Sequence, residues 1–366
     1  MRKRLLFICS FFVFILSFSF NSYAIDVSAK SAIVIECDSS DIIFSKNADL
    51  QLPMASTTKI MTAIVALENS NIDKIVTIGK ESVGIEGSSI YLQEGEKLSI
   101  RQLLYALLLE SANDAANAIA FEVGGSIENF AEMMNLKANE LGLKNTHFTN
   151  PHGLDDSMHY TTANELAKIA QYAMQNPIFC EIVSSRKEIL PMTDGCRLLV
   201  NHNKLLRSYD GAIGVKTGFT KKSGRCLVSC AERDGVRLIA VTLNAYGDWD
   251  DHKKMLDYGF EKYEHLNLAQ AGDYTISLNC VNGEKSSVLC TNFSSIGVTI
   301  QRNVKSDIKA VFEAERFVFA PIKQGTKVGR IVFYSNDKEI ASVDICALES
   351  VKGIKYKKSI IERIFG

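Results

Sequence analysis

Three short motifs follow one another along this chain, and any fold that uses them must bring together segments up to about 160 residues apart. They are Ser56-Thr57-Thr58-Lys59, Ser111-Ala112-Asn113 and Lys216-Thr217-Gly218. Each motif alone occurs by chance in many proteins. Together, and in this order, they supply the serine, the lysine base and the amide that nucleophilic catalysis by a serine uses.

Ser56 is the predicted nucleophile and Lys59 its predicted base, because a serine hydroxyl reacts at neutral pH only with a base in contact. The apolar run after Lys59 predicts a helix over Ser56–Asn69, which places the lysine one turn from the serine on the same face. Such a lysine acts as a base only if its pKa falls. Burial and a nearby cation both lower it, and Lys216 is the candidate cation. The alternative for Ser56 alone is an ordinary helix N-cap.

The sequence around the first motif, LPMASTTKIMTA at positions 52–63, closely resembles the nucleophile region of the low-molecular-mass penicillin-binding proteins. These are the serine-type D-Ala-D-Ala carboxypeptidases, and the resemblance extends over nearly the whole chain after residue 24. It implies an α+β fold with a β-lactamase/transpeptidase-like catalytic domain over residues 25–264, in which a helical cluster lies against an antiparallel sheet. A small all-β domain over residues 265–350 is expected next, and short alternating stretches separated by turn residues also predict it.

The second motif follows a predicted helix over Ile100–Leu109 that starts with a capping box. Ser111 is the third predicted catalytic residue, since its hydroxyl can relay a proton toward the leaving amine. Asn113 is a predicted substrate-binding residue whose amide can hold a peptide group of the substrate. The alternative for Asn113 is a structural amide that bridges two loops.

The third motif ends a predicted strand, and an extended peptide can pair with the edge of such a strand. Gly218 allows that peptide to approach closely. The resemblance implies that Lys216 and Thr217 bind the terminal carboxylate of the peptide. The oxyanion hole is then expected from the backbone N–H groups of Ser56 and Phe219.

Two features depart from the resemblance or compete with it. Many relatives carry an arginine just before a helix that here starts near Lys253, and no arginine stands there. Arg225 is the nearest candidate replacement, with a solvated charge at a strand end as the alternative. Glu165 occupies the region where class A β-lactamases keep a glutamate for deacylation, but the preceding Thr162 predicts a capping box instead.

The two ends of the chain predict export and membrane attachment. Residues 1–24 are typical of a cleaved secretory signal, with three basic residues, a 16-residue apolar run and a small-residue end at Ala24. The alternative is an uncleaved anchor, although a spanning helix needs about 20 residues. Residues 351–366 predict a basic amphipathic tail on the outer face of the cytoplasmic membrane, next to the cell wall. The alternative is a helix packed on the β-domain.

Composition bears on possible nucleic-acid partners, metals and cofactors. The net charge is −1 and becomes −4 once the three basic residues of the leader are removed, so the sequence does not predict a nucleic-acid partner. The six histidines are scattered and no C-x-x-C pair occurs, so neither a metal site nor a cofactor is expected.

The expected function is removal of the terminal D-alanine from peptidoglycan pentapeptide stems through an acyl-enzyme on Ser56, with β-lactam antibiotics as inhibitors. One alternative is a class A-like β-lactamase, which the β-domain and the tail disfavour. The other is a non-catalytic penicillin-binding sensor, which requires a damaged motif, whereas all three motifs are intact.

Overall fold

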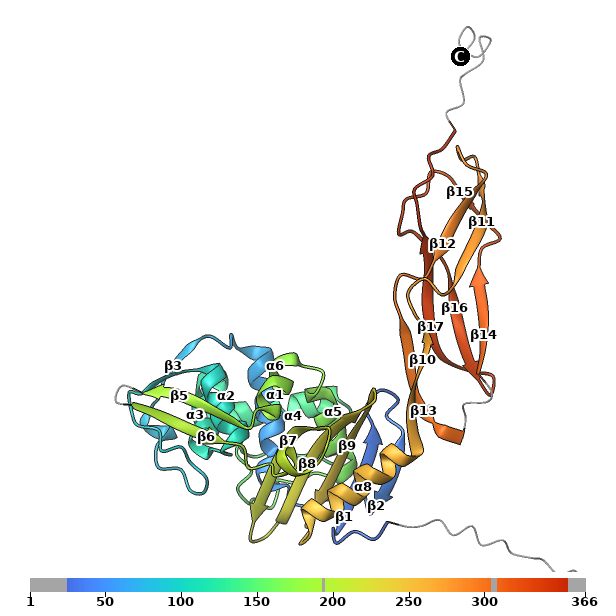
Figure 1. Cartoon of the computed structure of the whole chain (residues 1–366). Helices are drawn as coiled ribbons and strands as arrows, with labels where there is room; N and C mark the ends of the chain where they lie inside the picture. Colours follow the sequence, from blue (N-terminus) through green and yellow to red (C-terminus); the bar gives the residue numbers. More distant parts are fainter. Residues whose placement is uncertain (1–24, 193–194, 304–307, 355–366) are drawn as a thin grey trace, which may run out of the picture.

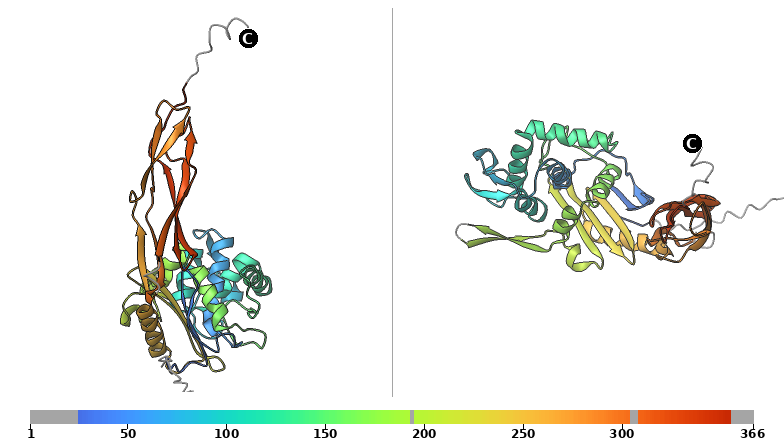
Figure 2. Two further views of the ribbon diagram at one scale, coloured as in Figure 1. Left: turned by 90° about the vertical axis from the view of Figure 1, so that its right-hand side faces the viewer. Right: turned by 90° about the horizontal axis from the view of Figure 1, so that it is seen from above.

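The structure is a computed structural model that describes residues 25–192, 195–303 and 308–354. A sheet with helices on both faces forms the first part, and an elongated β-domain extends away from it (Figures 1 and 2). This architecture confirms the predicted α+β catalytic fold followed by an all-β domain.

The first part is built on a five-stranded antiparallel sheet with the order β2-β1-β9-β8-β7. Its strands are β1 (Ser31–Glu36), β2 (Ile42–Lys46), β7 (Ala212–Thr220), β8 (Gly224–Arg233) and β9 (Val236–Leu243). Strand β7 carries the third motif and lies at an edge of the sheet, so one side of its backbone is free to pair with an extended peptide.

Helices cover both faces of this sheet. One face carries α1 (Lys59–Asn69), α2 (Ile100–Leu109), α3 (Asn113–Gly124), α4 (Ile127–Glu140), α5 (Ala163–Ala173) and α6 (Pro177–Ser184). The other face carries α8 (Asp248–Lys262). Short elements complete this part: η1 (Ala55–Thr58), η2 (Lys80–Ser82), α7 (Leu205–Ser208), and the pairs β3 (Ile75–Thr77) with β4 (Lys97–Ser99) and β5 (Lys187–Met192) with β6 (Gly195–Val200).

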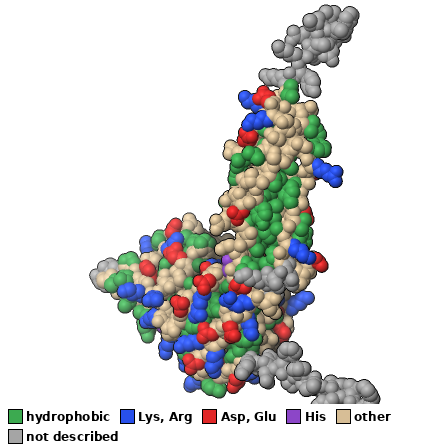
Figure 3. All heavy atoms as spheres, turned by 45° about the vertical axis from the view of Figure 1, so that its right-hand side comes forward, with side chains coloured by type: hydrophobic (Ala, Val, Ile, Leu, Met, Phe, Trp, Pro, Cys, Tyr) green, Lys and Arg blue, Asp and Glu red, His purple; other side chains and the backbone are tan. Residues whose placement is uncertain are grey.

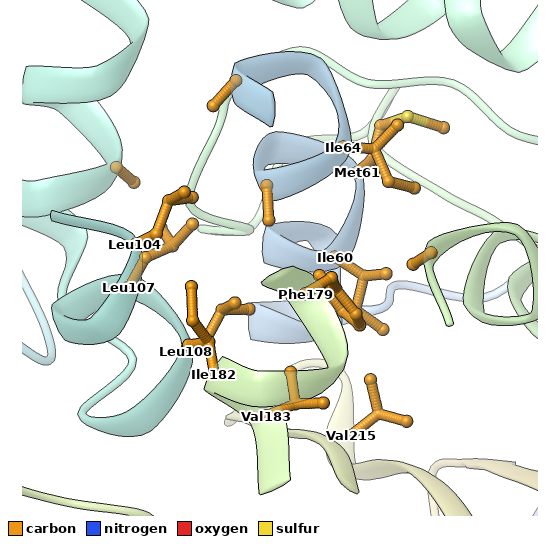
Figure 4. Close-up of a cluster of buried hydrophobic side chains, with 14 of the residues drawn as sticks. Ile60, Met61, Ile64, Leu104, Leu107, Leu108, Phe179, Ile182, Val183 and Val215 are labelled. Carbon is orange, nitrogen blue, oxygen red and sulfur yellow. The ribbon is translucent and has the colours of Figure 1, made fainter. Parts of the chain in front are cut away.

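Helix α1 lies in the middle of the helical cluster and is buried over two full turns, since every residue from Lys59 to Ala66 is inaccessible to solvent. Figure 4 shows Ile60 of α1 beside Phe179 of α6, with Leu108 of α2 and Val215 of β7 around them. A helix packed on all sides holds its N-terminal end in a fixed place. The turn that carries Ser56 is attached to that end.

The C-terminal domain begins with β10 (Tyr263–Ala269), which follows α8 directly and pairs with β13 (Ile296–Gln301). Its main sheet has six strands in the order β14-β16-β17-β12-β11-β15. These are β11 (Thr275–Val281), β12 (Ser287–Thr291), β14 (Ile308–Ala314), β15 (Phe317–Phe319), β16 (Lys327–Ser335) and β17 (Lys338–Ala347). This domain has its own core, separate from that of the first part, and hydrophobic side chains also gather on one outer face of it (Figure 3).

Several predicted elements agree with the structure, and others need correction. The helix predicted over Ile100–Leu109 has those bounds, whereas the closing helix begins at Asp248, five residues before the predicted Lys253. The hairpin β5–β6 was not predicted. The domain boundary expected after residue 264 falls inside β10 and stays a prediction. No helix in the described parts of the chain is long and apolar enough to cross a bilayer.

A buried histidine joins α8 to the sheet. The Nδ1 of His252 lies 2.5 Å from the hydroxyl of Ser229 on β8, and its Nε2 lies 3.0 Å from the hydroxyl of Thr242 on β9. Burial lowers the pKa of His252 to about 3. The folded protein therefore keeps this ring neutral at pH values where an unfolded chain protonates it.

We predict that lowering the pH from 7 to 5 reduces the free energy of unfolding of this domain by about 2 kcal/mol through His252 alone. The unfolded chain binds a proton on this residue near its usual pKa of about 6.5, and the folded state does so only near 3. Stability is thus present above pH 6.5 and falls as the pH drops toward 3. Urea denaturation followed by the fluorescence of Trp249, the single tryptophan, measures it. The variant His252→Asn should lose about this much of the pH dependence, and an unchanged dependence contradicts the prediction.

Candidate active site

All three motifs border one cavity of about 390 Å³ between η1, the start of α3 and the edge strand β7. Its lining consists of Ser56, Ser88, Ser111, His202, Lys204, Thr217, Gly218, Phe219, Arg225, Asp248 and Trp249. The structure therefore brings Ser56, Ser111, Thr217, Gly218 and Phe219 to one place, as the sequence predicts. Lys59, Asn113 and Lys216 lie behind this lining and are almost completely buried.

Ser56 lies in a tight 3-10 turn, Ala55–Thr58, and α1 begins only at Lys59. The prediction of an α-helix from Ser56 onward is corrected here. The hydroxyl of Thr57 donates to the carbonyl of Met54 at 2.6 Å, and that of Thr58 donates to the carbonyl of Ala55 at 2.7 Å. These side chains bond back to the backbone three residues earlier and so stabilise the tighter turn.

Lys59 has no exposed surface, and its Nζ has three oxygen neighbours. It lies 3.1 Å from Ser56 Oγ, 2.6 Å from Asn113 Oδ1 and 2.6 Å from the carbonyl oxygen of His152. Burial, and then the positive charge of Lys216, hold the pKa of Lys59 well below its usual value. A neutral amine has two N–H bonds and one lone pair. In its neutral form the amine can donate to Asn113 and His152 and direct its lone pair to the hydroxyl of Ser56.

The amide of Asn113 is used at both ends. Its Oδ1 accepts from Lys59, and its Nδ2 donates to the carbonyl of Glu86 at 2.6 Å. This side chain therefore bridges the loop around Glu86 and the base. The second N–H of Nδ2 and the second lone pair of Oδ1 have no part in these two bonds and can contact a substrate.

A loop from Asn150 to Leu154 packs under the serine turn and fixes the base. The hydroxyl of Thr62 donates to the carbonyl of Pro151 at 2.6 Å, which places the next carbonyl, that of His152, on Lys59. Gly153 has a φ of 87°, and a Cβ there would lie 1.9 Å from the carbonyl oxygen of Ala55. Only glycine fits this contact between the loop and the serine turn. Burial lowers the pKa of the His152 ring to about 3, so the ring is neutral at pH 7, and its Nδ1 accepts from the backbone nitrogen of Leu154 within the loop.

Ser111 and Lys216 complete the buried side of the cavity. Ser111 is 5 % exposed and has a φ of 61°, a left-handed conformation that side chains other than glycine rarely adopt. Backbone strain of this kind persists where the surrounding structure holds it, often at active sites. Burial lowers the pKa of Lys216 to about 7, so this lysine is only partly charged at neutral pH. Its Nζ donates to the carbonyl of Thr217 at 2.9 Å.

The outer edge of the cavity is the end of β7. A Cβ on Gly218 would lie 3.0 Å from the backbone nitrogen of Ser56, so strand and serine turn touch at this glycine. The Phe219 side chain that follows is 65 % exposed. The backbone N–H groups of Ser56 and Phe219 thus belong to two segments that meet beside the serine hydroxyl.

Glu165, the residue that raised the β-lactamase alternative, is not among the residues that line the cavity. Its carboxylate accepts from the backbone nitrogens of Lys144 and Asn145 and from the hydroxyl of Thr146. Thr162 caps its backbone nitrogen at 3.1 Å, but the carboxylate does not return to Thr162, so the predicted capping box is only half formed. No group of metal-ligating side chains occurs in the part of the chain that the structure describes.

Comparison with known sequence families gives two matches that divide the chain. Residues 19–247 match the family described as D-alanyl-D-alanine carboxypeptidase. Residues 263–353 match the C-terminal domain of penicillin-binding protein 5.

Individual relatives agree with these families. The chain is 32 % identical to D-alanyl-D-alanine carboxypeptidase DacF of Bacillus subtilis over 334 residues, covering 88 % of this chain and 86 % of the relative. It is 31 % identical to DacA of Escherichia coli over 356 residues, which covers 92 % and 87 %. Among solved structures, penicillin-binding protein 5 of Haemophilus influenzae matches with a TM-score of 0.67 and 29 % identity, covering 90 % of this chain and 98 % of that one. The Streptomyces K15 DD-transpeptidase matches with a TM-score of 0.62 and 35 % identity, covering 65 % and 98 %.

We predict that Lys216→Met moves the acidic limb of the pH profile for acylation of Ser56 to higher pH, by roughly one unit. Protonated Lys216 lowers the pKa of Lys59, so its removal lets Lys59 hold a proton at higher pH and lose its action as a base. This shift of the acidic limb is expected below about pH 7, where Lys216 is mostly charged. A thioester without a carboxylate is the probe, because it removes any contribution of Lys216 to carboxylate binding. The control Lys221→Met removes an exposed lysine after β7 and should leave the limb in place. A limb that stays fixed in Lys216→Met contradicts the coupling.

Proposed function

This chain belongs to the D-alanyl-D-alanine carboxypeptidase family, and from that premise we propose a role for each residue of its catalytic cavity. It is a serine-type D-Ala-D-Ala carboxypeptidase that binds penicillin and acts on peptidoglycan stem peptides. The observation that carries the assignment of roles is the position of Lys59 Nζ, in contact with Ser56 Oγ and two carbonyl oxygens.

In the acylation step, Ser56 Oγ attacks the carbonyl carbon between the two terminal D-alanines while its proton passes to neutral Lys59. The carbonyl oxygen gains negative charge and accepts hydrogen bonds from the backbone N–H groups of Ser56 and Phe219. The short distance between Gly218 and the backbone nitrogen of Ser56 supports this oxyanion hole, because Phe219 follows Gly218 directly and its N–H group is therefore near that of Ser56.

Collapse of the tetrahedral intermediate breaks the peptide bond, and the leaving amine needs a proton. Ser111 lines the same cavity, and we assign its hydroxyl as the relay that passes this proton from Lys59 to the departing D-alanine. Water then attacks the ester on Ser56 while Lys59 accepts a proton from that water. The bond between the carbonyl carbon and Ser56 Oγ breaks, Lys59 returns the proton to Oγ, and the shortened peptide leaves. Penicillin acylates the same serine.

Substrate binding uses the free edge of β7. The peptide lies extended along that strand, with its terminal carboxylate toward Lys216 and Thr217 and its backbone close to Gly218. Asn113 orients Lys59 through its Oδ1 and donates to the substrate with the Nδ2 hydrogen that Glu86 does not use.

Neither alternative activity is favoured. A class A-like β-lactamase needs a carboxylate that activates the deacylating water, and Glu165 is instead held by the backbone of the loop after α4. A non-catalytic sensor needs a broken site, whereas Ser56, Lys59 and Asn113 are connected by hydrogen bonds.

We predict that Ser56→Ala abolishes covalent labelling by fluorescent penicillin. Release of D-alanine from diacetyl-Lys-D-Ala-D-Ala should fall roughly a thousandfold or more, because the nucleophile is lost. Gel fluorescence and a D-alanine assay measure the two effects. Ser88→Ala is the matched control, since Ser88 lines the same cavity without an assigned step and should keep its label. Labelling that survives in Ser56→Ala would sink the assignment of the nucleophile.

We also propose that residues 1–24 direct export and that residues 351–366 attach the enzyme to the outer face of the cytoplasmic membrane. Residues 1–24 and 355–366 lie outside the described part of the chain, so for them both proposals rest on the sequence. Residues 351–354 are described and bond to the β-domain, where Val351 pairs with Ile322 and Ile354 donates to the carbonyl of Asn282. The tail carries five basic residues, Lys352, Lys355, Lys357, Lys358 and Arg363, among isoleucines. Basic residues bind anionic headgroups while an apolar stripe enters the interface.

We predict that deleting residues 355–366, which keeps the bonds of residues 351–354 to the β-domain, releases the mature protein from anionic vesicles without lowering its activity on soluble peptide. Each basic residue contributes on the order of 1 kcal/mol near such a surface, and salt screens the attraction. Vesicle sedimentation at low and high salt measures the effect, with uncharged vesicles as the control. Full-length mature protein that stays in solution at low salt contradicts the proposal.

A further inference from the structure

We infer that Arg225, held in position by Asp248, binds the terminal carboxylate of the peptide and so selects free carboxyl ends. This inference rests on the proposed function, since it assigns a specificity-determining residue to the same cavity. It concerns a residue outside the three motifs.

Strand register aims Arg225 into the cavity. Arg225 on β8 pairs directly with Phe219 on β7, so the two side chains lie on the same side of the sheet. Thr217 lies two residues earlier on β7 and therefore shares that side. Arg225, Thr217 and Ser56 all line the cavity. The guanidinium is thus next to the threonine at which the proposed substrate ends.

Asp248, at the start of α8, fixes one side of the guanidinium and leaves the other side open. Its Oδ1 accepts from Nε of Arg225 at 3.0 Å, and the Asp248 side chain is 5 % exposed against 45 % for Arg225. In the described parts of the chain, Asp248 is the one side chain that accepts from Arg225. The terminal N–H groups therefore remain for a ligand, and their planar fork matches the two oxygens of a carboxylate.

The other basic side chains in or behind the cavity lining are less suited to this task. Lys216 is buried, is partly neutral near pH 7 and donates to the carbonyl of Thr217. Nε2 of His202 lies 3.1 Å from the carboxylate of Glu110. Lys204 lies over the ring of Trp249 with its Nζ 5.9 Å from the ring centre. Arg225 alone among these four combines a permanent charge with an open pair of donors facing the cavity.

The test compares two peptides in which the enzyme cleaves the same bond. One is diacetyl-Lys-D-Ala-D-Ala, and the other is its methyl ester at the terminal carboxyl group. With Arg225→Gln, kcat/KM for the acid should fall about 10- to 100-fold, mainly through KM, because a charge-assisted bidentate contact is lost. The value for the ester should change less than about threefold. Retained ester cleavage also shows that the variant is folded.

Two further variants separate binding from positioning. Asp248→Asn should lower the acid-to-ester preference less than Arg225→Gln does, and the double variant should match Arg225→Gln, because Asp248 acts only through the arginine. Arg237→Gln is the matched control. Arg237 pairs with Glu232 at the opposite end of the β8–β9 hairpin and should leave the preference unchanged.

Equal loss for acid and ester in Arg225→Gln, or no loss for either, overturns the inference. An additive double variant overturns the positioning role of Asp248. Failure of the proposed function has a different signature, because a wild-type enzyme that cleaves neither peptide, or a Ser56→Ala variant that cleaves both, refutes the acyl-enzyme on Ser56 itself.

Discussion

Removal of the Lys59 amine from water is the constraint on which the rest of the catalytic domain depends. A lysine in water is protonated and has no lone pair to accept the proton of a serine. Here the amine is enclosed by α1, by Asn113 at the start of α3 and by the loop that ends at Leu154. Asn113 and His152 supply oxygen acceptors for the amine, and α1 packs around its side chain. These contacts offset the free-energy cost of burying Lys59, the proposed base.

The segments that enclose the Lys59 amine lie far apart in the chain. For this reason only part of the site could be predicted from the sequence. Serine, lysine and threonine side chains supply reactive or binding groups themselves, so Ser56, Lys59, Ser111 and Thr217 could be predicted from their types and order, and the structure places them close together. The carbonyl of His152 could not be, since a backbone oxygen 93 residues from Lys59 leaves no mark in the sequence. The pair of Arg225 with Asp248 likewise depends on how the start of α8 meets β8.

Some secondary-structure elements could also be predicted from their own residues, whereas others could not. The bounds of α2 follow from its capping box and apolar run, both of which are local. The turn at Ser56 was mistaken for helix because the hydroxyls of Thr57 and Thr58 bond back to the preceding carbonyls. Hairpin β5–β6 was not predicted, since Pro191 interrupts the sequence pattern of its first strand. A two-stranded hairpin tolerates this proline, although proline has no backbone N–H to donate.

The burial of α1 also limits how such an enzyme can escape an antibiotic. In the proposed mechanism penicillin and the peptide acylate the same serine, and the side chains from Lys59 to Ala66 that follow it are buried. A substitution that moves Lys59 away from Ser56 therefore removes both reactions together. The exposed rim of the cavity is different, because a side chain such as Phe219 can change size there, and with it the fit of a drug, without moving Lys59.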